Sequence, residues 1–211
     1  MEGLALVLDK LPSLQKVGLK NALAYERSVD FDVPDEIAAW AAWGKLNPTE
    51  PERKAFGDCV VDRLCRLAGE RDIPFQMHLG SALIRGPCRA APAHPVPAHA
   101  PGVSLDRRAA RHGLFVYRNI WIDLTWSWIL SPTRFREAFQ EAVEVLPDES
   151  RMMLGGDTWH AEEAYGAITD VRRLVAESLD AMVKGGAFRC RDAERLALKV
   201  LHDNAKAFFG L

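Results

Sequence analysis

The sequence predicts an α/β fold in a single domain, built on a parallel sheet, and two observations support this. Short, almost continuously apolar segments that end in a polar residue or a glycine recur along the chain, as expected for strands buried on both faces. Between or after them lie longer segments whose apolar residues recur at helical spacing. Strands that alternate with helices form right-handed crossover units, so the sheet is expected to be parallel.

Four segments match the strand pattern: 15–23, 73–80, 119–126 and 151–158. In parallel sheets the chemistry lies where the strands end and their loops begin. The polar residues at the ends of these segments are therefore the first candidates for a site.

Helices that cover the sheet are predicted from apolar residues three and four positions apart. The three sets are Phe56, Val60, Leu64 and Leu67; Phe135, Ala138, Phe139, Ala142, Val143 and Leu146; and Ile168, Val171, Leu174, Val175, Leu179 and Met182. Ser131 followed by Pro132 predicts the start of the second helix, with serine as the N-cap and proline at the first helical position. A last helix, at about 191–209, is expected to place Leu198, Leu201, Ala205 and Phe208 on one face and to stop at Gly210.

Composition narrows the classes of function. The chain of 211 residues is 48% hydrophobic and 27% charged, and its formal charge of −2 comes from residues of both signs scattered along it. No basic stripe suggests nucleic acid, and no segment is long enough to span a membrane. Four cysteines without C-x-x-C spacing, and a start without the basic region of a signal peptide, favour a cytoplasmic protein.

Three ionisable residues, Lys20, His78 and Asp157, are expected at one rim of the sheet. Imidazole and carboxylate are both ligands for zinc or manganese, and a carboxylate can also take a proton from metal-bound water. Two ligands are fewer than the three that a catalytic metal site normally takes from protein, so others would have to come from elsewhere.

Each of these residues also has a structural explanation. His78 could be a hydrogen-bonded structural histidine, Asp157 could cap the following helix, and Lys20 could extend along the sheet edge to water. Gly155 and Gly156 favour a functional Asp157, because glycine lets the backbone approach another group closely. Further along, Asp123 is predicted to be an interior carboxylate with hydrogen-bond partners; Trp121, Trp126 and Trp128 are predicted to pack.

The segment 86–113 does not follow the strand and helix alternation. It contains five of the twelve prolines and three of the six histidines, His94, His99 and His112, without helical or strand periodicity. Three interpretations are open: a flexible proline-rich loop, a histidine-rich metal tract, and a frame disruption in GC-rich coding sequence. The last is the preferred hypothesis, and translation of the encoding DNA in the other two frames would test it.

Three blocks occur in a characteristic order. They are Gly18-Leu19-Lys20 with Ala24-Tyr25-Glu26-Arg27; Pro74-Phe75-Gln76-Met77-His78-Leu79-Gly80; and, over 119–211, Asn119-Ile120-Trp121-Ile122-Asp123-Leu124, Gly155-Gly156-Asp157 and Asp203-Asn204-Ala205-Lys206. In order and spacing they resemble the C-terminal part of the amidohydrolase-related, metal-dependent hydrolases, which are (β/α)8 TIM barrels and include uronate isomerase-like members. The resemblance implies a partial barrel over 1–211, approximately strands four to eight, with the N-terminal strands missing.

The resemblance also implies roles for individual residues. Lys20 would close the fourth strand, His78 the fifth and Asp157 the eighth. His78 and Asp157 would bind a divalent metal, most simply zinc, with manganese as the alternative, and Asp157 would also act as the base; Lys20 would join it in catalysis. Tyr25, Arg27, Trp126 and His160 would face a small-molecule substrate.

Several activities remain open at this point. In the hydrolases of this group a metal-bound water attacks a carbonyl-type centre, whereas the isomerase-like members shuttle protons between sugar carbons. The family's H-x-H pair on its first strand does not occur here, and a complete barrel takes about 250 residues. A partial barrel exposes sheet edges that another copy could cover as a homo-oligomer, so a non-catalytic interaction module is the second hypothesis.

Overall fold

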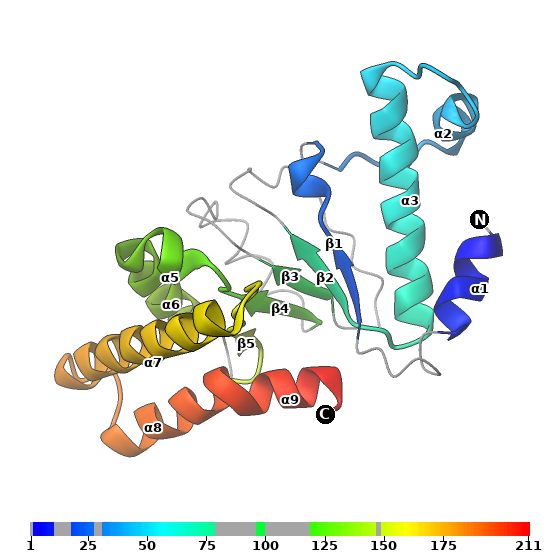
Figure 1. The fold of residues 1–211 in the computed structure, drawn as a ribbon. Helices are drawn as coiled ribbons and strands as arrows, with labels where there is room; N and C mark the ends of the chain where they lie inside the picture. The colour runs from blue at the N-terminus through cyan, green and yellow to red at the C-terminus, as the bar shows by residue number, and fades with distance from the viewer. Residues whose placement is uncertain (1, 11–17, 28–30, 79–95, 100–118, 147–148) are drawn as a thin grey trace.

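The computed structural model describes residues 2–10, 18–27, 31–78, 96–99, 119–146 and 149–211 as one sheet with surrounding helices (Figure 1). The strands are β1 (Leu19–Asn21), β2 (Phe75–His78), β3 (Val96–His99), β4 (Ile120–Asp123) and β5 (Met152–Met153). The α-helices are α1 (Glu2–Lys10), α2 (Glu36–Ala42), α3 (Glu50–Glu70), α5 (Ser127–Leu130), α6 (Pro132–Val145), α7 (Ala161–Lys184), α8 (Cys190–Leu198) and α9 (Asn204–Phe209). A 3₁₀ turn, η2 (Leu23–Tyr25), and a π-helical segment, η3 (Lys199–Asp203), complete the order.

The five strands form one parallel sheet in chain order, β1-β2-β3-β4-β5, and every neighbouring pair is parallel. This confirms the α/β class and the parallel sheet. Four of the strands lie inside the segments with the strand pattern, although residues 15–17 of the first segment lie outside the described residues.

The fifth strand was not expected, because β3 lies inside the segment 86–113. The prediction that this segment lacks strand structure is wrong for Val96–His99, which pairs with β2 on one side and β4 on the other. Pro97 and Ala98 hide the apolar pattern, and pairing with strands on both sides overrides their low strand preference. The ordinary reading frame therefore provides a strand that ends in a histidine. His94 and His112 lie outside the described residues.

Two hydrophobic clusters between the sheet and its helices lie on one face of the sheet. Met77, Ala98, Ile122 and Met152 are in register across β2 to β5. Met77 packs in a cluster with Val61 and Ala68 of α3, whereas Ile122 and Met152 pack in a second cluster with α6, α7 and α8. Residues in register share a face, so both clusters lie on the same side of the sheet.

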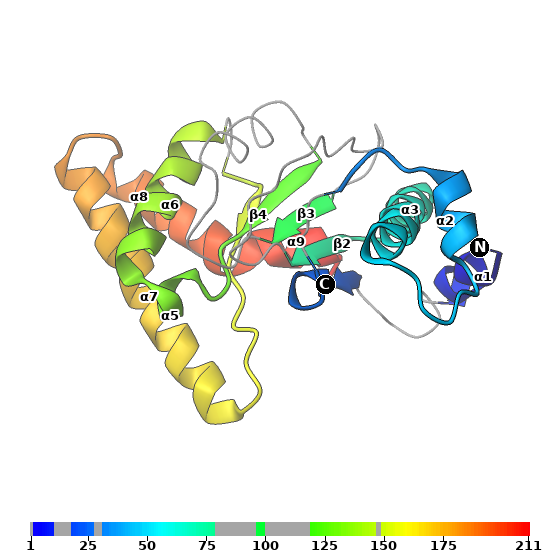
Figure 2. The same ribbon diagram turned by 90° about the horizontal axis from the view of Figure 1, so that it is seen from above.

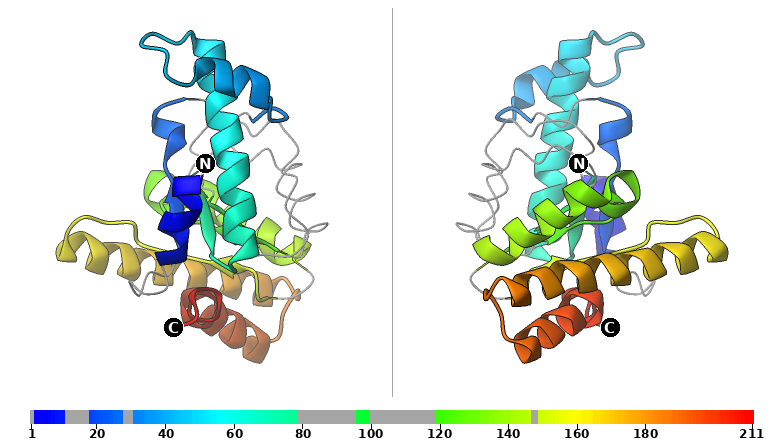
Figure 3. Two further views of the ribbon diagram at one scale, coloured as in Figure 1. Left: turned by 90° about the vertical axis from the view of Figure 1, so that its right-hand side faces the viewer. Right: turned by 90° about the vertical axis from the view of Figure 1, so that its left-hand side faces the viewer.

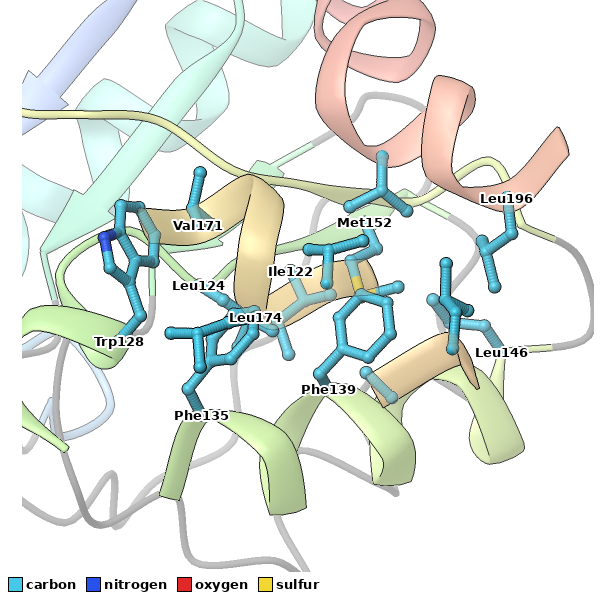
Figure 4. Close-up of a cluster of buried hydrophobic side chains, with 14 of the residues drawn as sticks. Ile122, Leu124, Trp128, Phe135, Phe139, Leu146, Met152, Val171, Leu174 and Leu196 are labelled. Atoms are coloured by element: carbon cyan, nitrogen blue, oxygen red, sulfur yellow. The ribbon is translucent and has the colours of Figure 1, made fainter. Parts of the chain in front are cut away.

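The second cluster is the larger core, and its centre is fully buried. Phe135 and Phe139 of α6 are stacked 5.7 Å apart between ring centroids, and they face Leu174 of α7 and Ile122 of β4 (Figure 4). Seen from above, α3 lies toward one end of the sheet and α6 with α7 toward the other (Figure 2). Because side chains alternate along a strand, the polar residues Gln76, His78 and Asp123 point to the opposite face.

The start of α6 agrees with its prediction, and the start of α3 has a similar arrangement. The Ser131 side chain accepts a hydrogen bond from the backbone N–H of Arg134, with Pro132 as the first helical residue, as expected for α6. The α3 helix begins with a capping box between Thr49 and Glu52. Each device satisfies N–H groups that have no partner inside the helix.

The C-terminal helix buries Phe208 and packs Leu201 against the core as predicted, and it differs from its prediction at Leu198. It runs from Cys190 to Phe209 with η3 in its middle, and Gly210 ends it with a φ of +67° as predicted. The buried positions include Leu196, Val200 and Asn204, whereas Leu198 is 66% exposed. The pattern of apolar residues alone could not show that the polar Asn204 faces inward. The helix lies at the opposite end of the molecule from α2 (Figure 3).

Candidate functional site

Polar residues lie at the carboxyl ends of three neighbouring strands. His78, His99 and Asp123 are in register at the last residues of β2, β3 and β4. The side chains of His78 and Asp123 are both buried. His78 thus lies at the end of its strand, where the sequence places it.

Lys20 and Asp157 meet above this row. The Lys20 ammonium donates a hydrogen bond of 3.0 Å to Oδ1 of Asp157, and each side chain is 39% exposed. Lys20 lies on β1 and Asp157 follows β5, the two edges of the described sheet, which would be roughly 19 Å apart in a flat sheet. The lysine side chain and the loop after β5 therefore reach toward each other over the ends of the inner strands.

Asp157 is not a helix cap. The N-cap position of α7 is His160, which is exposed and makes no side-chain hydrogen bond to the helix. The backbone of Asp157 has a φ of +44°, in the left-handed region that non-glycine residues seldom adopt. Its carbonyl accepts a 2.9 Å hydrogen bond from the indole N–H of Trp126, whose own φ is +67°.

His78 is covered by Tyr25. The two rings are in edge contact, with centroids 4.8 Å apart, and Tyr25 lies in η2, directly after β1. The Asn21 side chain accepts a hydrogen bond of 2.7 Å from the Leu23 N–H, which starts this turn. The exposed Tyr25 thus lies between the ring of His78 and water.

Arg27 is held by the helix α3. Its guanidinium forms an ion pair with the buried Asp58 and lies 5.2 Å from the centroid of the Phe31 ring. Lys54 bonds the same carboxylate at 2.8 Å, and although burial opposes it, hydrogen bonds to Asp32 and Asp58 raise the pKa of Lys54. Contact of Arg27 with substrate stays a prediction; the partner Asp58 could not be inferred from the sequence, because it lies on another element.

A chain of hydrogen bonds links β2, the end of β4 and the loop that carries Asp157. Gln76 donates to Oδ2 of Asp123 at 3.0 Å, and the Thr125 hydroxyl donates to Oδ1 at 2.5 Å. The same hydroxyl accepts a bond of 2.8 Å from the N–H of Gly155. Asp123 is therefore the interior carboxylate that the sequence predicts, and Thr125, two residues later, is the member that sequence reasoning missed.

Two of the three tryptophans, Trp121 and Trp128, pack as predicted, and the third makes a hydrogen bond. Trp128 is buried against Phe135, Trp121 contacts Phe208 of α9 with ring centroids 4.8 Å apart, and Trp126 bonds the Asp157 loop. The contacts of Trp126 do not test whether it also meets a substrate. His160 likewise stays a prediction as a substrate contact.

The metal site is incomplete in the described side chains. His78 and Asp157 are donors of the right chemistry for a divalent cation, but within the described ranges no three His, Cys, Asp or Glu side chains are grouped to hold one. The donors therefore fit a metal in kind and not in number. Among the same residues, no helix has both the length and the apolar character of a membrane span.

Comparison with known proteins identifies the class. The chain belongs to a family described as amidohydrolase, whose model matches residues 27–211. None of the curated proteins matches the sequence. The resemblance inferred from the strand-end residues is thereby confirmed.

Two solved structures share the fold. One is described as a metal-dependent hydrolase from Lactobacillus casei, with a TM-score of 0.74 and 18% identity over 98% of this chain. The other is a uronate isomerase from Thermotoga maritima, with a TM-score of 0.68 and 15% identity over 86% of this chain. The chain spans 58% of the first protein and 48% of the second.

Proposed function

We propose that this chain carries part of a hydrolase site in which Asp157 takes a proton from an attacking water and Lys20 orients its carboxylate. The observation that carries the proposal is the 3.0 Å contact between these two residues above the carboxyl ends of the strands. Chemistry in parallel α/β folds is concentrated at this end of the sheet.

The contact leaves Asp157 able to act as a base. Oδ1 accepts the bond from Lys20, whereas Oδ2 has no hydrogen-bond partner among the described residues. With 39% of its side chain exposed, the carboxylate is open to water. The ammonium of Lys20 also places positive charge where an oxygen of a small-molecule substrate would gain negative charge, which favours the transition state.

A divalent metal, zinc or manganese, is part of the proposal. His78 and Asp157 would hold it, with at least one further ligand from outside the described side chains. Such an ion would polarise the substrate carbonyl and make bound water more acidic. Because β1 and β5 are the edge strands of the described sheet, we also propose that another copy covers these edges.

The test is metal binding by the full chain. Zinc chloride is titrated into the purified, metal-free protein by calorimetry, and metal content after dialysis is measured by mass spectrometry. We expect about one zinc per chain, with the affinity reduced at least tenfold in His78→Ala and Asp157→Asn. Asp170→Asn, on the exposed side of α7, is the matched control and should bind like the wild type. Absence of zinc binding in the wild type, or equal binding by all variants, would contradict the proposal.

The same preparation decides between the candidate activities. Hydrolysis of a panel of amides, esters and lactones, lost in Lys20→Ala and Asp157→Asn, would support the hydrolase. Conversion of a uronate without hydrolysis would replace it by the isomerase. Metal-free protein that is inactive on both sets would favour the interaction module, and light scattering would show whether it is a homo-oligomer.

A further inference from the structure

Two neighbouring residues after β4 hold the loop that carries Asp157 at two points. The Thr125 hydroxyl accepts a hydrogen bond of 2.8 Å from the Gly155 N–H. The Trp126 indole N–H donates a bond of 2.9 Å to the carbonyl of Asp157 itself. The loop is thus fixed both at the first of its two glycines and at the aspartate.

Thr125 is itself firmly anchored. It is 1% exposed, its hydroxyl donates to Oδ1 of Asp123 at 2.5 Å, and its N–H donates to the same oxygen at 2.9 Å. Gln76 of β2 donates to the other oxygen of Asp123. The support for the loop therefore extends through β4 to β2, the strand that ends in His78.

The backbone gives a reason for this support. Trp126 and Asp157 are two of the three non-glycine residues with positive φ in the described chain, and they are hydrogen-bonded to each other. Such conformations are unfavourable for side chains with a Cβ and persist where the surroundings determine them. Without the two bonds, the loop would relax and the carboxylate of Asp157 would move relative to Lys20.

We propose that Thr125 and Trp126 are positioning residues for Asp157, which hold its carboxylate at the site through their hydrogen bonds to its loop. This inference rests on the proposed function of Asp157. The geometry of the loop and the chemistry of the carboxylate can be measured separately, so the two proposals can fail independently.

The first arm of the test measures the loop in the metal-free protein. Amide hydrogen exchange is followed by NMR in Thr125→Val, which keeps the side-chain shape and removes the hydroxyl, and in Trp126→Phe, which removes the indole N–H. We expect the Gly155 amide to exchange roughly tenfold faster in Thr125→Val, because it loses its acceptor. The conservative Thr125→Ser should restore the wild-type rate.

The second arm measures zinc affinity in the same variants. Loss of groups that orient a metal ligand reduces affinity by roughly 10–100-fold, so Thr125→Val and Trp126→Phe should bind zinc at least tenfold more weakly. Two matched controls are available. Thr169→Val removes a hydroxyl that bonds the Tyr165 carbonyl on the exposed side of α7, and Trp159→Phe changes a residue that is 88% exposed. Both should leave loop exchange and zinc affinity unchanged.

Each outcome is decisive. A Gly155 exchange rate in Thr125→Val within twofold of the wild type, or the same increase in the two controls, would overturn the positioning role. Zinc affinities of Thr125→Val and Trp126→Phe equal to the wild type would overturn it as well. A wild-type protein that binds no zinc would instead refute the metal site of the proposed function, and the exchange arm alone would then decide whether the loop is held.

Discussion

Gly155 lies where the loop after β5 passes closest to β4. A Cβ at this position would lie 2.9 Å from the Thr125 hydroxyl oxygen, which is closer than such atoms approach. We expect Gly155→Ala to lower the free energy of unfolding by about 1–3 kcal/mol, because the hydroxyl or the loop must shift. Urea denaturation at neutral pH measures the change.

Gly166 provides the matched control for this substitution. It lies in the interior of α7, and a Cβ there would meet nothing within 4 Å. Gly166→Ala should raise the free energy of unfolding by about 0.5–1 kcal/mol, because alanine favours the helix. Similar values for both variants would show that the contact with Thr125 does not constrain the loop.

Individual residues of the site were predictable where strand ends revealed them. Lys20, His78 and Asp157 each follow or interrupt an apolar run, so their place at the rim could be inferred from the sequence. The pairing of Arg27 with Asp58 and that of Asp157 with Trp126 could not be inferred, because the partners come from elements distant in sequence. Pairings of this kind depend on how elements pack and leave no periodic signal.

Among the elements, the C-terminal helix is hydrogen-bonded to the segment around β5 through a buried amide. The buried Asn204 amide donates to the carbonyls of Glu149 and Met152, at 2.6 and 2.8 Å. Asn204→Ala would leave both carbonyls without this donor, so we expect a loss of about 1–3 kcal/mol in the free energy of unfolding. Thermal and urea unfolding measure it.

Asn47 is the control, because it is exposed in the turn before α3. Asn47→Ala should change stability by less than about 0.5 kcal/mol. A loss in Asn204→Ala no larger than in this control would mean that the helix is held by its apolar face alone.

Secondary structure followed from the sequence where periodicity was strong. The amphipathic helices α3, α6 and α7 were predicted from spacing, and so were four strands. Strand β3 was missed because Pro97 and Ala98 have low strand preference, and pairing on both sides overrides that preference. In the C-terminal helix only Leu198 was placed on the wrong side, because the buried positions are Leu196 and Val200 on either side of it.

At the scale of the whole molecule, acid should weaken the fold through Glu149. Hydrogen bonds from Arg195 lower the pKa of this carboxyl below its ordinary value of 4.5, and Lys199 adds to the effect. The unfolded chain therefore takes up the proton first as the pH falls. The stabilisation is complete above about pH 4.5 and is lost as the pH falls through the folded pKa.

Glu149→Gln isolates this contribution. The difference in urea midpoint between the wild type and the variant should be largest from pH 5.5 to 7 and should narrow below pH 4.5. When Arg195→Gln is introduced into both proteins, this difference in urea midpoint should become smaller from pH 5.5 to 7, because the substitution removes the partner of Glu149. A difference that stays constant from pH 7 to pH 3 would contradict the assignment.

The two faces of the sheet differ in how far the sequence predicts what packs on them. Apolar patterns predicted α3, α6 and α7, and register shows that the two hydrophobic clusters that include these helices lie on the face of Met77 and Ile122. The opposite face holds His78 and Asp123, and sequence patterns could not show what encloses it. The contacts on this face join residues that are distant in sequence, and such contacts leave no periodic pattern in the chain.

The left-handed backbone of Asp157 bears on why an aspartate stands there at all. Holding a residue with a Cβ in this conformation costs about 1–2 kcal/mol, whereas a half-exposed ion pair such as that with Lys20 returns about 0–1 kcal/mol. For stability alone glycine would suit this position, because it adopts a positive φ without a side-chain penalty. The backbone and the ion pair thus do not by themselves explain an aspartate here, which is in keeping with the role proposed for its carboxylate.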